Sequence, residues 1–230
     1  MRIYAVILSA GQGKRLNEKL PKGFIKLEGK PLFLWSLEAF DQTEEIQGGV
    51  LVVPENWEEE VKKYLINLKK EWLITKGGPT RQESSFLGLL ALESLKPDYV
   101  LIHDGARPFL KKDLTKRLLL EAPQAVIPVI PAQETLIEAD ENWASKTLDR
   151  KKVKIVQTPQ GFPYRRILEA HKLAQEEGLI DQSDDSSLYL RYGGRVKLVE
   201  GDPFNIKITF PEDLKLAKWV LNYNHLLLRP

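Results

Sequence analysis

The stretch LSAGQGKRLNEKLPKGF, residues 8–24, joins glycines to basic residues directly after a short apolar run. Gly11 and Gly13 allow a loop whose backbone N–H groups converge on one point. Arg15 and Lys22 add positive charge to that loop, and both side-chain types bind phosphate oxygens. The pattern favours a phosphate ligand, although glycines also serve in plain turns between a strand and a helix.

The loop matches neither of two familiar nucleotide-binding motifs. Leu16 stands at the third glycine of the G-x-G-x-x-G pattern, and the spacing of a P-loop, G-x-x-x-x-G-K-[ST], is absent from it. Pro21 restricts the backbone beside Lys22 and so fixes a second basic residue across the loop from Arg15. We therefore expect a polyphosphate site of a different design.

A few further positions could carry chemistry. Asp104 ends the apolar run YVLIH, where a carboxylate can bind Mg²⁺ and through it a nucleotide phosphate, or can cap the turn that follows. Ser84 and Ser85 lie near the start of an expected helix and could cap it or contact a ligand. His103 points to the other side of the strand and has no second His or Glu at metal-binding spacing, which indicates a structural role.

Apolar runs and helical periodicity alternate along the chain and define the elements that must position these residues. Strands are expected at residues 4–8, 49–53, 71–75, 99–103 and 125–129, and helices at 31–40, 57–69, 81–95 and 112–121. A further helix is expected at 163–177, strands at 195–201 and 205–209, and a last helix from Pro211. The alternation predicts an α/β fold, a Rossmann-like and mostly parallel sheet wound on both faces by helices.

The segment 131–156 differs from the rest of the chain. It alternates polar and apolar residues around the turn-prone Asp140, Glu141 and Asn142, which predicts an antiparallel β-arm. An isolated hairpin is marginally stable in water, so the arm should pack against something else. We expect one domain, residues 1–230, from which this arm protrudes.

The composition limits the classes of function. The 230 residues are 43% hydrophobic, which is enough for one well-buried domain. The formal net charge of +2 favours small anionic partners over nucleic acid. There is no cysteine, which excludes disulfides and thiolate chemistry, and the charges that follow the first apolar run differ from a signal peptide. We expect a cytoplasmic protein with no membrane partner.

Polar segments follow the expected strands at their carboxyl ends, where doubly wound sheets bind ligands. In chain order, the blocks SAGQGKR, PKGF, GGPTRQES, HDGARP, PAQET, TPQGF, SDDSS and NIKITFPEDL resemble those of the 2-C-methyl-D-erythritol 4-phosphate cytidylyltransferase family. The resemblance extends from Ala5 to about Leu216. It implies a Mg²⁺-dependent enzyme of the non-mevalonate isoprenoid pathway that couples CTP to a sugar-alcohol phosphate and releases pyrophosphate.

The resemblance also implies roles for individual residues. Arg15, Lys22 and Lys207 would be catalytic, the first two around the CTP phosphates, and Asp104 would lie beside Mg²⁺. The nucleotide would be held by Ser9, Ala10, Gly11, Gly13, Gly77, Gly78, Arg81, Ser84, Asp104 and Gly105, with the cytidine end at positions 77–84. The acceptor phosphate would be surrounded by Arg107, Thr135, Arg150, Thr158 and Lys207. In the family the arm embraces a second subunit, which implies a homodimer whose arm residues reach the partner's site.

Several departures from the family pattern bear on these roles. Ser9 and Gly105 replace the usual alanines and Gly23 the usual glutamine, changes that leave nucleotide binding intact. Glu134 and Ile137 stand in the acceptor block where aspartate and lysine are common. D-Ribitol 5-phosphate therefore stays open as an alternative acceptor. A non-catalytic nucleotide-sensing protein of the same fold is a second alternative, against which the retained loop cations argue.

Overall fold

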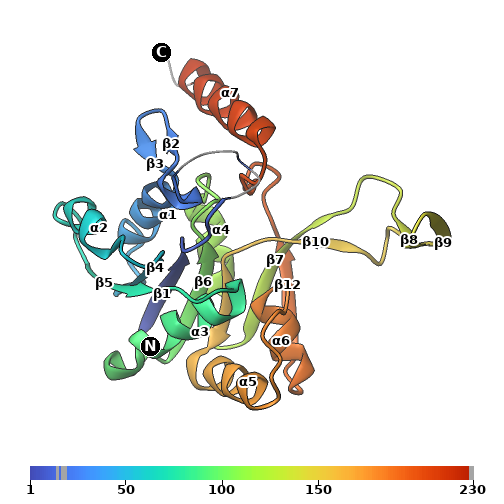
Figure 1. The fold of residues 1–230 in the computed structure, drawn as a ribbon, viewed down its shortest axis with the longest axis horizontal. Coiled ribbons are helices and arrows are strands. Elements are labelled where there is room, and N and C mark those ends of the chain that lie inside the picture. The colour runs from blue at the N-terminus through green and yellow to red at the C-terminus, as the bar shows by residue number, and fades with distance from the viewer. Residues whose placement is uncertain (14–15, 17–19, 228–230) are drawn as a thin grey trace.

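The computed structural model describes residues 1–13, 16 and 20–227, and its centre is an 8-stranded sheet (Figure 1). The strand order is β10 (Lys154–Val156), β7 (Ala125–Pro131), β11 (Gln160–Pro163), β6 (Tyr99–Asp104), β1 (Ile3–Leu8), β4 (Gly48–Val53) and β5 (Glu71–Lys76), and β12 (Val196–Glu200) pairs with β7. The pairs among β6, β1, β4 and β5 are parallel, as is β12 with β7, whereas β10 and β11 run antiparallel to their neighbours. The predicted α/β fold with a mostly parallel sheet is confirmed.

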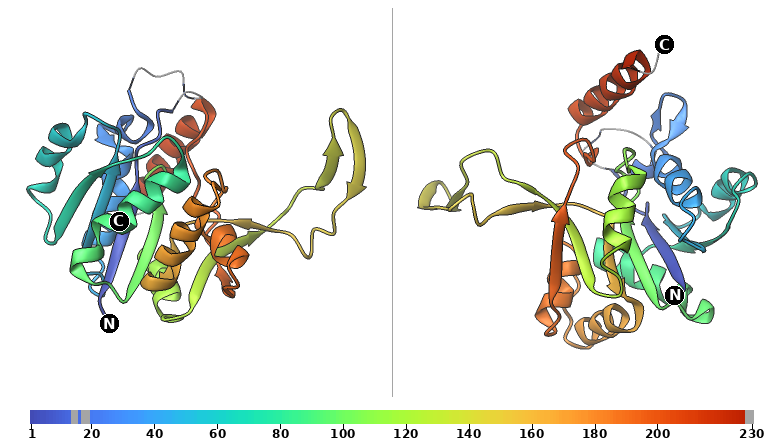
Figure 2. Two further views of the ribbon diagram at one scale, coloured as in Figure 1. Left: turned by 60° about the horizontal axis from the view of Figure 1, so that its bottom comes forward. Right: turned by 180° about the vertical axis from the view of Figure 1, so that it is seen from behind.

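Helices cover both faces of the sheet (Figure 2). On one face lie α1 (Leu32–Asp41), α2 (Glu58–Leu65) and α4 (Lys112–Leu119), and on the other α3 (Arg81–Ala91), α5 (Tyr164–Glu176) and α6 (Asp185–Arg191). The central strands β4 and β6 are buried along their whole length, because the side chains on each face meet helices. This double cover leaves the carboxyl ends of the strands as the place where a ligand can enter.

The last helix, α7 (Pro211–Leu227), stands beyond the carboxyl end of the sheet and packs near the short strands β2 (Lys26–Leu27) and β3 (Lys30–Pro31) (Figure 1). Its start is capped by Asp213, whose Oδ2 accepts the backbone N–H groups of Thr209 and Phe210, both at 2.8 Å. The helix therefore begins at Pro211, as predicted from the first-turn proline and acidic residues.

The strand predicted at residues 205–209 is wrong, because this segment is irregular. It crosses the ends of the strands instead of pairing with one. The Asn205 side chain donates to the carbonyl oxygen of Thr158 at 2.7 Å, and the N–H of Ile208 donates to Ala106 at 2.9 Å. Scattered hydrogen bonds to several loop residues hold the segment, so no ladder forms.

Other differences concern ends and short elements. α2 ends before the predicted residue 69, because the Asp41 carboxylate accepts the N–H groups of Lys69 and Lys70 at 2.9 and 3.0 Å and turns the chain toward β5. α3 ends at Ala91 and is followed by the 3-10 turn η3 (Glu93–Leu95), and α4 ends at Leu119. The sequence did not predict β11, α6, the β2–β3 hairpin or the 3-10 turn η2 (Lys22–Phe24).

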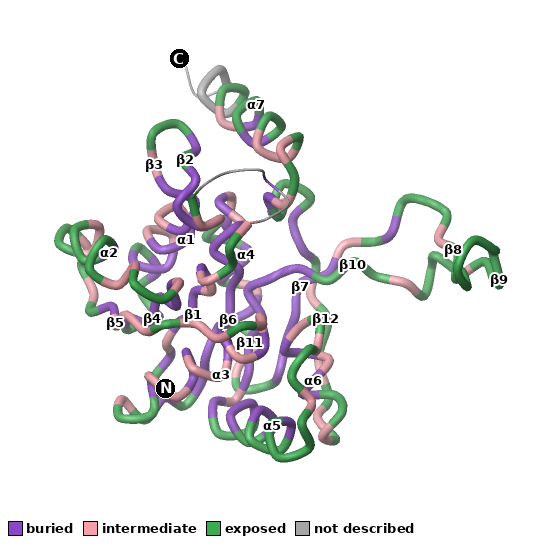
Figure 3. Tube along the Cα trace, viewed as in Figure 1, coloured by how far each residue is buried: buried purple, intermediate pink, exposed green. Residues whose placement is uncertain are grey.

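The arm expected at residues 131–156 protrudes from the body as an antiparallel excursion (Figures 1 and 2). At its base β10 pairs with the end of β7, and at its tip β8 (Ile137–Asp140) pairs with β9 (Trp143–Thr147). Every residue of β8 and β9 is exposed, in contrast to the central strands β4 and β6 (Figure 3). Within the described residues, no helix combines the length and the apolar character that a membrane span needs.

Candidate active site

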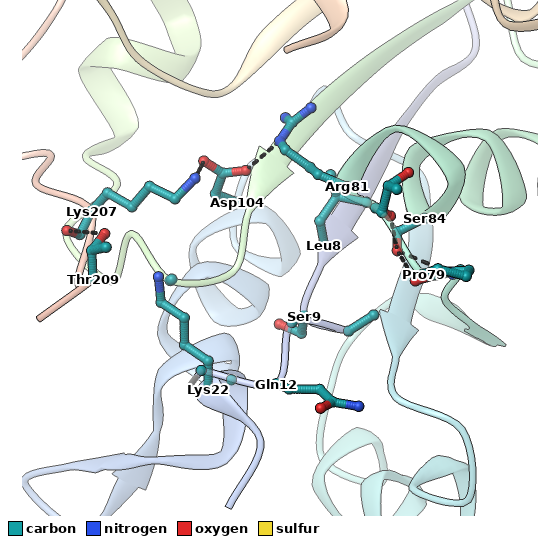
Figure 4. Close-up of a pocket in the computed structure, with 17 residues that line it drawn as sticks. Leu8, Ser9, Gln12, Lys22, Pro79, Arg81, Ser84, Asp104, Lys207 and Thr209 are labelled. Atoms are coloured by element: carbon teal, nitrogen blue, oxygen red, sulfur yellow. Dashed lines mark hydrogen bonds and ion pairs between the residues drawn. The ribbon is translucent and has the colours of Figure 1, made fainter. Parts of the chain in front are cut away.

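A pocket of about 610 Å³ lies at the carboxyl ends of β1, β5 and β6 (Figure 4). Its wall comes from the loop after β1, the turn at Lys22, the start of α3, the end of β6 and the irregular segment that follows β12. The lining includes many of the residues singled out in the sequence: Ser9, Ala10, Gly11, Gly13, Lys22, Gly78, Arg81, Ser84, Asp104 and Lys207. Polar segments far apart in the chain thus meet at one edge of the sheet.

The glycine loop folds back on the turn that carries Lys22. The N–H of Lys22 donates to the carbonyl oxygen of Gly11 at 3.0 Å. Gly13 has φ +67, a left-handed conformation that favours glycine, and a Cβ there would lie 2.9 Å from that of Lys22. In the part of the chain that the structure describes, the N–H groups of Gly11, Gln12 and Gly13 have no protein acceptor. The loop therefore offers donors to an anion in the pocket, as its composition predicts.

Asp104 is surrounded by cations at the opposite wall. Its Oδ1 accepts from Arg81 Nε at 3.0 Å, and its Oδ2 lies 2.9 Å from Lys207 Nζ and 3.7 Å from Arg107 Nε. Burial alone would raise the pKa of this carboxyl, but the charges of Arg81, Lys207 and Arg107 hold the pKa well below its ordinary value. Asp104 is therefore ionised. Its carboxylate binds these cations and does not mainly cap the turn that follows.

A chain of hydrogen bonds supports Asp104 from behind. The backbone N–H of Asp104 donates to Thr158 Oγ1 at 3.1 Å, and that hydroxyl lies 3.0 Å from His103 Nδ1. His103 Nε2 lies 3.3 Å from the carbonyl oxygen of Arg107, which can only accept, so the proton of the neutral ring is on Nε2. Burial lowers the pKa of His103 to about 4. His103 is buried and does not line the pocket, in agreement with a structural role.

The other predicted residues fall into three groups. Gly77, Gly105, Arg107 and Thr158 lie directly behind the pocket wall: Arg107 Nη1 donates to Asn205 O at 2.7 Å, and the Thr158 hydroxyl is engaged by Asp104. Thr135 and Arg150 lie on the arm and are not among the residues that line the pocket. The prediction for Arg15 lies outside the described residues.

Two groups of residues were missed in the sequence. Gln12, Pro79, Thr80 and Thr209 line the pocket without having been named. Asp185 binds Arg81 from outside the pocket, with Nη1 to Oδ2 at 2.8 Å. A signal for it existed in SDDSS, because a helix needs only one N-cap, and here Asp184 fills it by accepting from Ser187 N at 2.9 Å. The second aspartate of the pair was therefore available for another partner.

Asp104 is the one carboxylate among the described residues that lines the pocket. In residues 1–13, 16 and 20–227, no group of three or more His, Cys, Asp or Glu side chains could hold a metal ion. One carboxylate fits Mg²⁺ when substrate phosphates supply further ligands, because this ion is often bound by one or two carboxylates plus phosphates. The residues present thus fit a metal that arrives with a nucleotide.

Comparison with known proteins identifies the family. A profile of 2-C-methyl-D-erythritol 4-phosphate cytidylyltransferase matches residues 3–223. The chain belongs to this family. The cytidylyltransferase of Geobacillus thermodenitrificans is 41% identical over 227 residues, which cover 96% of this chain and 97% of the relative. That of Aquifex aeolicus is 41% identical over 223 residues, covering 94% and 96%.

Solved structures of the cytidylyltransferase family share the whole fold. The 4-diphosphocytidyl-2C-methyl-D-erythritol synthase of Anaerococcus prevotii superimposes with a TM-score of 0.84 at 30% identity, over 96% of each chain. The 2-C-methyl-D-erythritol 4-phosphate cytidylyltransferase of Thermus thermophilus gives 0.76 at 32% identity, over 96% of this chain and 100% of that chain. The resemblance drawn from the ordered sequence blocks is confirmed.

Proposed function

We propose that this protein transfers CMP from CTP to 2-C-methyl-D-erythritol 4-phosphate, forming 4-diphosphocytidyl-2-C-methyl-D-erythritol and pyrophosphate. Family membership over residues 3–223 supports the reaction. The observation that carries it is the pocket itself, in which a glycine loop with available N–H groups shares one cavity with Lys22 and Lys207. In Figure 4 the Lys22 side chain extends toward the wall that holds Asp104 and Lys207.

The reaction needs charge neutralisation more than a base. A phosphate oxygen of the acceptor attacks the α-phosphorus of CTP, the bond from that phosphorus to the β-phosphate oxygen breaks, and pyrophosphate leaves. Both reactants are polyanions that repel each other, and the acceptor phosphate is already ionised near neutral pH. Lys22 and the glycine loop would stabilise the triphosphate, and Lys207 would draw the acceptor phosphate into line.

We propose Mg²⁺ as the cofactor, bound by CTP phosphates and by Asp104. When bound, the ion supplies positive charge that offsets the extra charge on the α-phosphate. Asp104 has one oxygen on Arg81 and the other on Lys207, so it would share its carboxylate with the ion. Asp104→Asn should raise the Mg²⁺ concentration needed for half-maximal activity several-fold, and an unchanged titration would remove Asp104 from the metal site.

We further propose a homodimer in which each arm reaches the partner's pocket. The arm that carries Thr135 and Arg150 extends away from the body (Figure 2), and neither residue lines the pocket of its own chain. The arm tip exposes 80% of Trp143 and 54% of Ile137, which is unfavourable in water unless another surface covers them. A cytoplasmic location is proposed on the absence of cysteine and on the use of a nucleotide substrate.

A panel of acceptors tests the proposed function. Purified protein with Mg²⁺ and CTP should release pyrophosphate with 2-C-methyl-D-erythritol 4-phosphate, and GTP or ATP should be poor donors. A clear preference for D-ribitol 5-phosphate would overturn the acceptor while keeping the reaction class. Binding of CTP without release under any acceptor would favour the non-catalytic sensor.

A further inference from the structure

Arg81 lines the pocket, yet two of its three guanidinium nitrogens bind carboxylates of the protein. Its Nε donates to Asp104 Oδ1 at 3.0 Å and its Nη1 to Asp185 Oδ2 at 2.8 Å. The third nitrogen, Nη2, is buried and has no partner among the described residues. In Figure 4 the side chain extends toward Asp104, away from Gln12 on the loop. A nucleotide in the pocket would find little of this guanidinium free to bind.

The far end of Arg81 is held by a buried polar cluster. Asp185 is 1% exposed, and its Oδ1 accepts from the Ser85 hydroxyl at 2.6 Å and from His171 Nε2 at 3.1 Å. Because the aspartate is ionised and accepts only, His171 Nε2 is the donor of this hydrogen bond. The His171 ring is stacked on Phe86, with 5.9 Å between centroids. These contacts fix the position of the Asp185 carboxylate, and its hydrogen bond to Arg81 in turn fixes the guanidinium.

The two carboxylates differ in their surroundings. Asp104 lines the pocket, whereas Asp185 lies outside it at the start of α6. Arg81 joins them with two nitrogens of one planar group, which sets the orientation of the Asp104 carboxylate as well as its position. Lys207 and Arg107 approach the other oxygen of Asp104. Without Arg81, that carboxylate could turn toward these two cations and away from its present orientation.

We propose that Arg81 is a positioning residue for Asp104, anchored by Asp185, Ser85 and His171, and that it does not bind the nucleotide. This assignment differs from the one implied by resemblance, which places Arg81 at the cytidine end of CTP. The kinetic part of the inference rests on the proposed function, but its binding part does not. If Arg81 bound the nucleotide, its substitution would weaken CTP binding. If Arg81 positions Asp104, its substitution lowers kcat and leaves CTP binding unchanged.

Arg81→Lys keeps the positive charge but removes the planar group that joins the two carboxylates. The positioning role predicts that kcat falls by about tenfold to a hundredfold, because a displaced catalytic group slows an aligned reaction. The dissociation constant of CTP, measured by calorimetry without Mg²⁺, should stay within about twofold. A tenfold rise in that dissociation constant, or an unchanged kcat, overturns the proposal.

Adjacent serines on α3 provide a matched pair. Ser85 is part of the buried cluster, while Ser84 lines the pocket and its hydroxyl is 2.9 Å from the carbonyl oxygen of Thr80. Ser85→Ala should lower kcat about threefold or more and leave CTP binding unchanged, since it loosens only the anchor. Ser84→Ala should weaken CTP binding. Equal effects of the two substitutions on both quantities would argue against the anchor.

Failure of the proposed function gives a different result. If the wild-type protein releases no pyrophosphate with either acceptor, the proposed reaction is wrong. The calorimetric comparison of CTP binding then still decides the role of Arg81, because an unchanged affinity in Arg81→Lys supports positioning and a tenfold loss contradicts it. Thermal unfolding of each variant, monitored by circular dichroism, checks that the comparison is made between folded proteins.

Discussion

The pocket and the arm differ in how their side chains are buried and paired. At the pocket, Arg81 binds both Asp104 in the wall and Asp185 behind it, and the two aspartates are buried. On the arm, Arg150 donates to the carbonyl oxygen of Gln133 at its own base, and Trp143 is 80% exposed. The geometry of the pocket is therefore fixed within one chain, whereas the arm has side chains suited to a surface that its own body does not provide.

The largest effect should come from a cation of the pocket. Lys22→Ala removes positive charge near the α-phosphate, so kcat should fall by about a hundredfold to a thousandfold, on the order of 3–4 kcal/mol, with a smaller change in KM. Steady-state pyrophosphate release measures both constants. Lys26→Ala, an exposed residue outside the pocket, is the control and should behave as wild type. A raised KM with unchanged kcat would show that Lys22 binds ground state and transition state equally.

Mixing variants tests whether the arm serves the partner. Lys22→Ala protein and Arg150→Ala protein, each inactive, are partly unfolded together and refolded to exchange subunits. If Arg150 acts in the partner's site, each heterodimer has one site with both defects and one with neither, so random pairing restores about a quarter of wild-type sites. Pyrophosphate release should rise far above that of either parent.

The control mixes two body variants, Lys22→Ala with Lys207→Ala. These residues line the same pocket, so every site in a heterodimer keeps one defect and the mixture should stay inactive. Native mass spectrometry must confirm the exchange in both mixtures. If the mixture with Arg150→Ala also stays inactive despite exchange, the arm does not complete a partner's site.

The sequence predicted the sheet well, and for a physical reason. Buried parallel strands are unbroken apolar runs, and the loops that follow them must meet at one edge, so Asp104 and the glycine loop could be placed together before any coordinates. The prediction of a strand at 205–209 was wrong. NIKIT has the alternation of a strand, but it forms hydrogen bonds with Thr158 and Ala106 on two loops and not with a neighbouring strand. Such choices depend on tertiary partners that local pattern does not reveal.

The network behind the pocket could not be predicted from the sequence. Arg81 and Asp185 are separated by 104 positions and come together only because α3 and α6 lie on the same face. The resemblance to the family implied that Arg81 binds the nucleotide. A resemblance identifies residues that lie near a ligand, but it does not show which atoms each of them contacts. The direction of the guanidinium becomes visible only once both carboxylates are placed.

An aspartate-to-asparagine substitution can be made both in the network behind the pocket and on the arm, which compares a buried aspartate with an exposed one. Asp185→Asn leaves Arg81 without one of its charged partners in a buried setting, so the free energy of unfolding should fall by about 2–4 kcal/mol at pH 7. Asp149→Asn, on the exposed arm, should change it by less than about 0.5 kcal/mol. Urea unfolding measures both values. Equal effects would mean that burial of the aspartate does not matter.

The pH dependence of this difference has a definite sign. Burial opposes ionisation of Asp185, but the charge of Arg81 and the hydrogen bonds of His171 and Ser85 outweigh it and lower the pKa of Asp185 in the folded protein. The stability gained from the carboxylate is thus complete above the unfolded pKa, about 4, and is lost as pH falls below it. The gap between wild type and Asp185→Asn should narrow below pH about 4, and a gap that widens there would contradict this assignment.

The smallest effect concerns packing where two loops of the pocket touch. Gly105 follows Asp104, and a Cβ on Gly105 would overlap the Ser9 hydroxyl, which is itself buried and without a partner in the described chain. Gly105→Ala should therefore lower the free energy of unfolding by about 1–2 kcal/mol, and adding Ser9→Ala should restore most of it, because the hydroxyl is the atom in the way.

Ala144→Val adds bulk to the exposed arm and should cost less than about 0.5 kcal/mol. Urea unfolding of the two single variants and the double variant gives the coupling energy. Additive losses at positions 9 and 105 would show that the clash lies elsewhere in the wall, whereas a strong coupling would mean that the pocket, unlike the arm, leaves no room for one extra methyl group.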